Sequence, residues 1–330
     1  MRKTVCATLA VMMSVLFSPL SQAGQAWESY KARFFKPEGR IVDTGNGGVS
    51  HTEGQGFAML MAVANDDKAT FDKLWQWTNR ELKNKENGLF YWRYNPAESN
   101  PVADKNNAAD GDVLIAWALL KADARWHEKR YGAASDAITK ALVAHSVIRY
   151  AGYRVMLPGV QGFKLDGEAI LNPSYFVFPA WQAFAGRSHL PVWRDLIKDG
   201  KRLLGKMGSG KADLPADWVS LASDGKLEPA KSWPPRMSYD AIRIPLYLAW
   251  SDKQSPLLAP WKAWFGQFPR EQTPAWVNVM TNEYAPYMME GGLLAVRDLT
   301  MGQSSGEPEI TSKDDYYSAS LKMLAWISAQ

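Results

Sequence analysis

Apolar side chains recur every three or four residues along most of this 330-residue chain. The spacing gathers them on one face of a helix, as at Val113, Ala116, Trp117, Leu120 and Ala124. The pattern predicts about a dozen helices. They cover residues 25–35, 54–64, 68–83, 111–126, 132–147, 175–185, 191–207, 240–250, 256–266, 274–280, 288–297 and 315–328.

Strand signals, by contrast, are few and short, and they lie mainly at 89–94 and 153–157. Neither alternates with helices in the regular way that a parallel sheet requires. We find no sequence repeat of fixed period, which argues against a simple solenoid. The expected fold class is therefore all-α.

The first residues have the layout of a secretory signal peptide. The basic pair Arg2-Lys3 precedes an apolar stretch over 5–20 and a small-residue segment at 21–23. The apolar stretch is short for a membrane span, and no later run approaches the roughly 18 apolar residues that a transmembrane helix needs. We expect residues 1–23 to be a signal peptide, residues 24–330 to form a single domain, and the protein to be exported to the periplasm or secreted.

The composition argues against several kinds of chemistry. The formal charge of +4 falls to about +2 without Arg2 and Lys3, which gives no reason to expect nucleic acid. Cys6 is the only cysteine, so the mature chain would have no thiol and no disulfide. The histidines show no His-Glu-x-x-His or similar ligand spacing, so neither a metal nor another cofactor is expected. A serine nucleophile also lacks support, since no Gly-x-Ser-x-Gly elbow occurs.

Aromatic side chains and long loops point to a binding surface. The chain contains 15 Trp, 13 Tyr and 12 Phe. Most of them are expected to pack in the core, but their flat apolar faces also suit the C–H faces of sugar rings. Four long connections, at 84–109, 148–173, 208–238 and 298–313, are rich in Gly, Pro, Asn and Asp. Loops of this length in a compact domain tend to be functional, and three of the four lead into the acidic segments or the aromatic element described next.

Glu53 stands in Ser50-His51-Thr52-Glu53-Gly54-Gln55, next to the two glycines Gly54 and Gly56, and an apolar helical run follows at once. Local physics favours a helix-capping role, because the helix dipole stabilises a carboxylate there. A general acid at this position would need burial or a neighbouring carboxylate to keep its proton.

Two further acidic segments also precede apolar helices. Asp110 and Asp112 are two residues apart and do not share a helix face, so one can cap the helix while the other points elsewhere. Asp240 and Arg243 are spaced for an ion pair at a helix start, which is a common structural feature. The same arginine would keep Asp240 ionised, which is the state that a general base requires.

Together these segments resemble glycoside hydrolase family 8, especially the bacterial endoglucanases associated with cellulose biosynthesis. The family's Ser-Glu-Gly-Gln motif is similar to Thr52-Glu53-Gly54-Gln55, and the family signature around two acids matches 108–126 with Ala109 as its one departure. Residues 239–243 resemble the segment with the base, and Asn172-Pro173-Ser174-Tyr175 resembles another recurring element. The likeness runs in order from about residue 26 to the C-terminus.

The resemblance implies an (α/α)6 barrel of six inner and six outer helices, and an endo-β-1,4-glucanase (cellulase) that inverts the anomeric centre. Glu53 would be the general acid and Asp240 the general base, roughly 6.5–9.5 Å apart. Asp110 would hold the sugar at the cleavage point and help to place the water, while Arg243 would orient the acids. We expect burial, or the negative charge of Asp110, to keep Glu53 protonated.

Aromatic residues near these motifs are candidate sugar contacts. Trp92, Tyr175 and Tyr239 are the favoured sugar contacts, and His51 is a further candidate because it adjoins Glu53. The substrate would be a β-1,4-glucan (cellulose) chain, the protein would be a monomer, and it would be linked to the machinery of cellulose synthesis.

Two alternatives stay open at this point. A hydrolase of the same family could act on chitosan, xylan or mixed-linkage glucan, because specificity depends on which loop side chains reach the sugar hydroxyls. A barrel that binds glycans without cleaving them is the other alternative, although such a protein would not need all three acids. Zero turnover on soluble carboxymethyl-cellulose, with binding intact, would favour the binding protein.

Overall fold

The computed structural model describes residues 24–303 and 306–330, and the predicted signal peptide at 1–23 lies outside these described residues. The α-helices are Gln25–Phe34 (α1), Thr52–Ala64 (α2), Lys68–Glu81 (α3), Ala109–Trp126 (α4), Lys129–His145 (α5), Phe178–Ser188 (α6), Pro191–Leu204 (α7), Arg243–Ser251 (α8), Ala259–Phe265 (α9), Gly291–Thr300 (α10) and Tyr316–Ala329 (α11). Short 3-10 helices cover Pro173–Tyr175 (η1), Pro256–Leu258 (η2) and Arg270–Gln272 (η3). The strands are Ser50–His51 (β1), Arg93–Tyr94 (β2), Val147–Tyr150 (β3), Tyr153–Met156 (β4), Glu168–Leu171 (β5), Val219–Ala222 (β6), Leu227–Pro229 (β7), Arg236–Met237 (β8) and Val277–Asn278 (β9).

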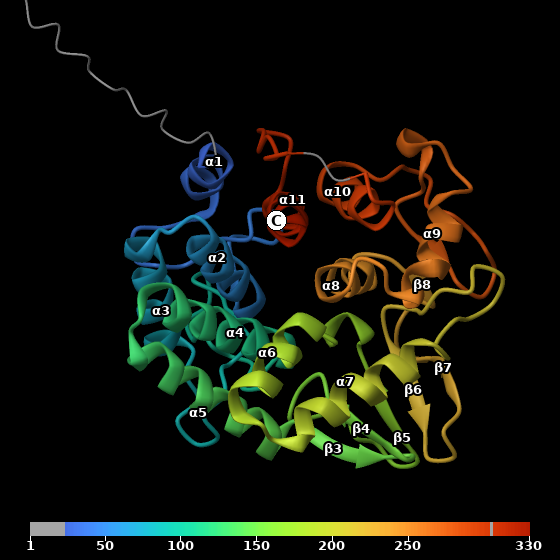
Figure 1. Cartoon of the computed structure of the whole chain (residues 1–330), viewed down its shortest axis with the longest axis horizontal. Coiled ribbons are helices and arrows are strands. Elements are labelled where there is room, and N and C mark those ends of the chain that lie inside the picture. The colour runs from blue at the N-terminus through green and yellow to red at the C-terminus, as the bar shows by residue number, and fades with distance from the viewer. Residues whose placement is uncertain (1–23, 304–305) are drawn as a thin grey trace, which may run out of the picture.

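Helices from the whole length of the chain surround the middle of the molecule. Figure 1 shows α2, α4, α6, α8 and α11 around this middle, with α3, α5, α7 and α9 outside them. Every residue of α2 from Gly54 to Val63 is buried, and so is every residue of α4 from Ala109 to Leu119. Helices that are buried on all sides belong to the interior. The C-terminal helix α11 packs against α2, which closes the ring. The predicted all-α class and (α/α)6 barrel are confirmed.

One predicted helix is wrong. Residues 274–280 contain no helix: β9 within this segment pairs antiparallel with β8, and residues 279–280 form a turn. Val277 and Val279 are fully buried while Asn278 between them is partly exposed, so the burial alternates with a period of two. β-Branched residues at alternate positions favour a strand over a helix. The remaining strands also form small antiparallel sheets of two or three strands.

None of the helices in the described part of the chain combines the length and the apolar character that a membrane crossing requires.

The first turns of α2 and α4 approach each other closely, and Gly111 makes this approach feasible. A Cβ atom at Gly111 would lie 2.5 Å from Thr52 Cβ and 3.0 Å from the backbone nitrogen of Glu53. Real Cβ atoms essentially never come within 3.0 Å of another heavy atom, and Thr52 Cβ is fixed by its backbone, so a larger residue would push the two helix starts apart. The close contact brings Glu53 on α2 next to Asp110 on α4.

We therefore expect Gly111→Ala to lower the free energy of unfolding by about 1–3 kcal/mol, because the added methyl group overpacks this contact. Urea denaturation measures the change. Gly186→Ala is the matched control, since Gly186 lies in α6 with no atom within 4 Å of its Cβ position. That substitution should stabilise the protein by up to about 1 kcal/mol. Equal stability of the two variants would contradict the proposed contact.

Candidate active site

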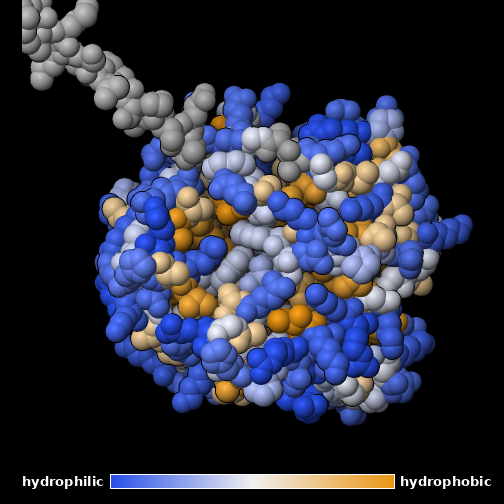
Figure 2. Space-filling model, viewed as in Figure 1, coloured by the Kyte–Doolittle hydropathy of each residue, from blue (hydrophilic) through white to orange (hydrophobic). Residues whose placement is uncertain are grey.

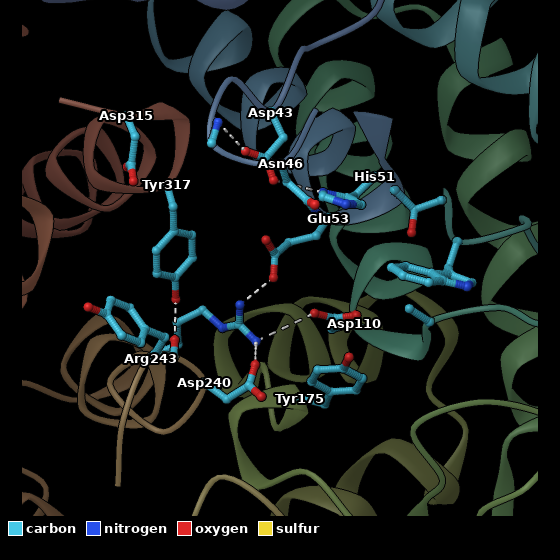
Figure 3. A pocket seen from close by; sticks show the side chains of 15 residues that line it. Asp43, Asn46, His51, Glu53, Asp110, Tyr175, Asp240, Arg243, Asp315 and Tyr317 are labelled. Carbon is cyan, nitrogen blue, oxygen red and sulfur yellow. Dashed lines mark hydrogen bonds and ion pairs between the residues drawn. The ribbon is translucent and has the colours of Figure 1, made fainter. Parts of the chain in front are cut away.

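A cavity of about 600 Å³ opens between the ends of the inner helices. Figure 2 shows a hollow near the middle of the face that Figure 1 presents, and Figure 3 shows the side chains that line the cavity. Acidic and aromatic side chains dominate the lining. The lining residues are Asp43, Gly45, Asn46, His51, Thr52, Glu53, Trp92, Ala108, Asp110, Tyr175, Tyr239, Asp240, Arg243, Asp315 and Tyr317. The cavity therefore brings together all seven residues that the sequence predicts for the site.

Glu53 lies in the first turn of α2, and its side chain is 18% exposed toward the cavity. Within the described residues its carboxylate accepts hydrogen bonds from Arg243 Nη1 and from the Tyr316 hydroxyl, the latter at 3.5 Å, rather than from the backbone of its own helix. The capping role that local physics favours is therefore not the one that Glu53 has.

Arg243 is the centre of the acidic cluster, as Figure 3 shows. It opens α8, only 4% of its side chain is exposed, and its guanidinium is always charged. Nη1 donates to Glu53, while Nη2 donates to Asp240 Oδ1 at 2.9 Å. Nη2 also donates to Ser174 Oγ at 2.9 Å and lies 3.9 Å from Asp110 Oδ2. The predicted i, i+3 pair with Asp240 is present, and it is one part of a larger network.

Asp110 is almost completely buried in the first turn of α4. Burial, together with the negative charge of Glu53, raises the pKa of the Asp110 carboxyl to about 8. Asp110 thus carries a proton near neutral pH in the unliganded protein.

Asp112 accepts hydrogen bonds from the loop before α4 and does not line the cavity. Its Oδ1 accepts from the backbone nitrogen of Phe90 at 2.9 Å, and its Oδ2 accepts from Asn107 Nδ2 at 2.8 Å. Burial raises the pKa of this carboxyl to about 7. The two neighbouring acids therefore point to different partners, as their spacing predicts.

The three predicted sugar contacts lie on different sides of the cavity. The Trp92 ring stacks on His51, with ring centroids 5.7 Å apart and an interplanar angle of 3°, and its indole N–H donates to Asp104 at 2.7 Å. Tyr239 is 45% exposed at the rim. Tyr175, in η1, is partly buried deeper in the site. Burial raises the pKa of the Tyr175 hydroxyl well above its usual value, so this hydroxyl is a neutral hydrogen-bond donor at any physiological pH.

Several site residues escaped the sequence analysis. Asp43 and Asp315 line the cavity from loops, and Asp315 also caps α11 by accepting from the backbone nitrogen of Ser318. Tyr317 donates its hydroxyl hydrogen to the backbone oxygen of Tyr239. The sequence signal for Asp315 and Tyr317 is an acid beside two tyrosines at a helix start, which helix capping explains equally well, and Asp43 has no such signal.

The chain is similar to known carbohydrate-cleaving enzymes over its whole length. A family model described as "Glycosyl hydrolases family 8" matches residues 1–330. An endoglucanase of Cellulomonas uda is 62% identical over 303 residues, which cover 92% of this chain and 84% of that protein. A probable endoglucanase of Novacetimonas hansenii is 39% identical, with 92% and 90% covered. The crystal structure of endoglucanase Cel10, a family 8 glycosyl hydrolase from Klebsiella pneumoniae, has a TM-score of 0.91 and 66% identity, and the match covers 92% of this chain and 98% of that one.

Proposed function

The chain belongs to family 8 of the glycosyl hydrolases, and we propose that it is an endo-β-1,4-glucanase in which Glu53 and Asp240 act on opposite sides of the scissile bond. The observation that carries the proposal is the bridge made by Arg243, which binds Glu53 through Nη1 and Asp240 through Nη2 within one cavity. One guanidinium lies between the two carboxylates and keeps them apart. Inverting hydrolysis needs such a gap, because a water molecule must fit beside the sugar.

Glu53 is the proposed general acid. Its Oε2 is engaged by Arg243, and Oε1, which lies 3.5 Å from the Tyr316 hydroxyl, is the oxygen that would carry the proton toward the glycosidic oxygen. A bound sugar would cover the exposed part of this side chain and exclude water from it.

Asp240 is the proposed general base. Its side chain is 32% exposed, so a water molecule can reach it, and Arg243 Nη2 holds one carboxylate oxygen, Oδ1, at 2.9 Å. Asp110, which holds a proton near neutral pH, can donate a hydrogen bond to the sugar between the two catalytic groups.

The stereochemistry of the product tests this arrangement. Water activated by Asp240 attacks from the face opposite the leaving group, so each cleaved β-1,4 bond should first yield the α anomer. Proton NMR of fresh cello-oligosaccharide digests resolves the two anomers before they equilibrate. Immediate β product would contradict the assignment of Asp240 as the base, and zero turnover with intact binding would favour a glycan-binding barrel instead.

Substrate range, location and partners are further parts of the proposal. A screen of soluble polysaccharides with reducing-end detection should give the highest rate on a β-1,4-glucan, and a higher rate on chitosan, xylan or mixed-linkage glucan would change the substrate class. The signal-peptide pattern at 1–23 supports export to the periplasm or beyond. A monomeric state and a link to cellulose synthesis rest on the family likeness alone.

A further inference from the structure

Asp240 lies in a short turn that has few backbone hydrogen bonds of its own. It is in the turn that precedes α8, and not in the helix itself. Backbone hydrogen bonds within the turn run from Ile242 N to Ser238 O and from Arg243 N to Asp240 O, both at 3.0 Å. A general base must be held within a fraction of an ångström to be effective, so this turn needs support from outside.

Asp217 supplies that support from a distant part of the chain. It lies just before β6, and one oxygen, Oδ1, accepts from the backbone nitrogens of Ser238 at 2.9 Å and Ala241 at 2.8 Å. The other oxygen, Oδ2, accepts from the hydroxyl of Ser238. The backbone nitrogen of Asp217 also donates to Arg236 O at 2.7 Å, so the two segments are joined on both sides. The carboxylate thus spans the turn from the residue two before Asp240 to the residue after it.

Asp217 itself is not one of the residues that line the cavity. Any effect of Asp217 on the reaction must therefore pass through the turn that it holds. We infer that Asp217 is a positioning residue for the general base, and that its three accepted hydrogen bonds fix the place of Asp240 beside the attacking water. This inference rests on the proposed role of Asp240.

The charge of Asp217 adds an effect that a purely structural residue would lack. Burial, together with the negative charge of Asp240, raises the pKa of the Asp217 carboxyl to about 6. The charged groups facing the turn are Asp217 on one side and Arg243 on the other, with Glu53 and Asp110 beyond the arginine, and the titratable hydroxyl of Tyr317 donates to the backbone oxygen of Tyr239 within the turn. The two aspartates repel each other when both are ionised, and this repulsion is reciprocal.

Two substitutions separate hydrogen bonding from charge. Asp217→Ala removes all three acceptor contacts and should lower kcat by about 10- to 100-fold with little change in KM, because the base loses its position while the sugar contacts remain. Asp217→Asn keeps an oxygen for the two backbone donors and should retain most of the turnover. It also removes a negative charge beside Asp240, so the acidic limb of its kcat/KM profile should move to lower pH.

The matched control is Asp199→Ala. Asp199 is also buried and accepts from a backbone nitrogen, that of Arg154 at 2.8 Å, but it lies on the outer helix α7. This variant should lose stability and keep both kcat and the acidic limb.

The pH profile of Asp217→Asn decides the inference even if the alanine variant does not fold. An unmoved acidic limb would overturn it, as would a wild-type kcat in folded Asp217→Ala. Asp240→Asn, measured in parallel, tests the proposed function separately. An inactive Asp240→Asn with fully active Asp217 variants would reject only the positioning role, whereas an active Asp240→Asn would reject the base assignment itself.

Discussion

Glu53→Gln should lower kcat on a β-1,4-glucan by about 10²- to 10⁴-fold, the usual contribution of general acid catalysis. The amide has nearly the shape of the carboxyl group, and its oxygen can still accept from Arg243 Nη1, so the cavity should keep its form. What the variant lacks is a proton acidic enough to leave with the glycosidic oxygen. Reducing-end release gives the rate, and calorimetry with a cello-oligosaccharide should give an affinity close to that of the wild type.

A comparison of rates on substrates with different leaving groups tests the acid role of Glu53 more directly. A dinitrophenyl cello-oligoside needs no protonation, so Glu53→Gln should cleave it far better, relative to the wild type, than it cleaves the natural glucan. Glu128→Gln is the matched control, because Glu128 also pairs with cations, Lys68 and Arg130, but it does not line the cavity. Equal losses on both substrates would mean that Glu53 has a structural role, and wild-type turnover on the glucan would remove it from the reaction.

The sequence predicts the helices well because apolar periodicity is encoded locally, whereas the barrel and the roles of the acids follow from the family resemblance. The inner helices are recognisable from apolar periodicity within single segments such as 111–126. Glu53 and Asp110 lie in the first turn of such a helix and Asp240 lies in the turn before one, and inner helices that begin on the same face of a barrel bring these starts together. Local physics assigned Glu53 to a cap because the competing partner, Arg243, lies 190 residues away in the chain.

What the sequence does not predict depends on contacts between distant segments. The non-helical conformation of 274–280 is fixed by pairing with β8, and no helical or strand period over seven residues is decisive. Asp217 looks like any loop acid, since its hydrogen-bond donors lie more than twenty residues further along the chain. The raised pKa of Asp110 likewise comes from burial and from the charge of Glu53 on another helix.

Asp110→Asn should make the protein more stable near neutral pH while it lowers activity. The pKa of Asp110 is about 8 in the folded protein, against 3.8 for an ordinary aspartate. Below the ordinary pKa, Asp110 is protonated in both the folded and the unfolded states, and its burial lowers the free energy of unfolding least there. As the pH rises toward 8, the unfolded state releases its proton while the folded state retains it. The free energy of unfolding should therefore fall by up to about 1.4 kcal/mol per pH unit on account of this residue.

Asparagine resembles the protonated acid and does not titrate. The free energy of unfolding of the variant therefore does not fall with rising pH on account of this residue. The difference in free energy of unfolding between Asp110→Asn and the wild type should be smallest at pH 4 and should grow by up to about 3 kcal/mol between pH 5 and pH 7. Urea denaturation at each pH measures it, and Asp199→Asn, with its acid on the outer helix α7, serves as the control. A difference that does not change with pH would show that Asp110 is ionised in the folded protein. We also expect the same variant to lose about 10²-fold in kcat. An amide in place of the carboxyl group would shift the sugar by a small distance, and a shift of that size lowers the rate by about this factor.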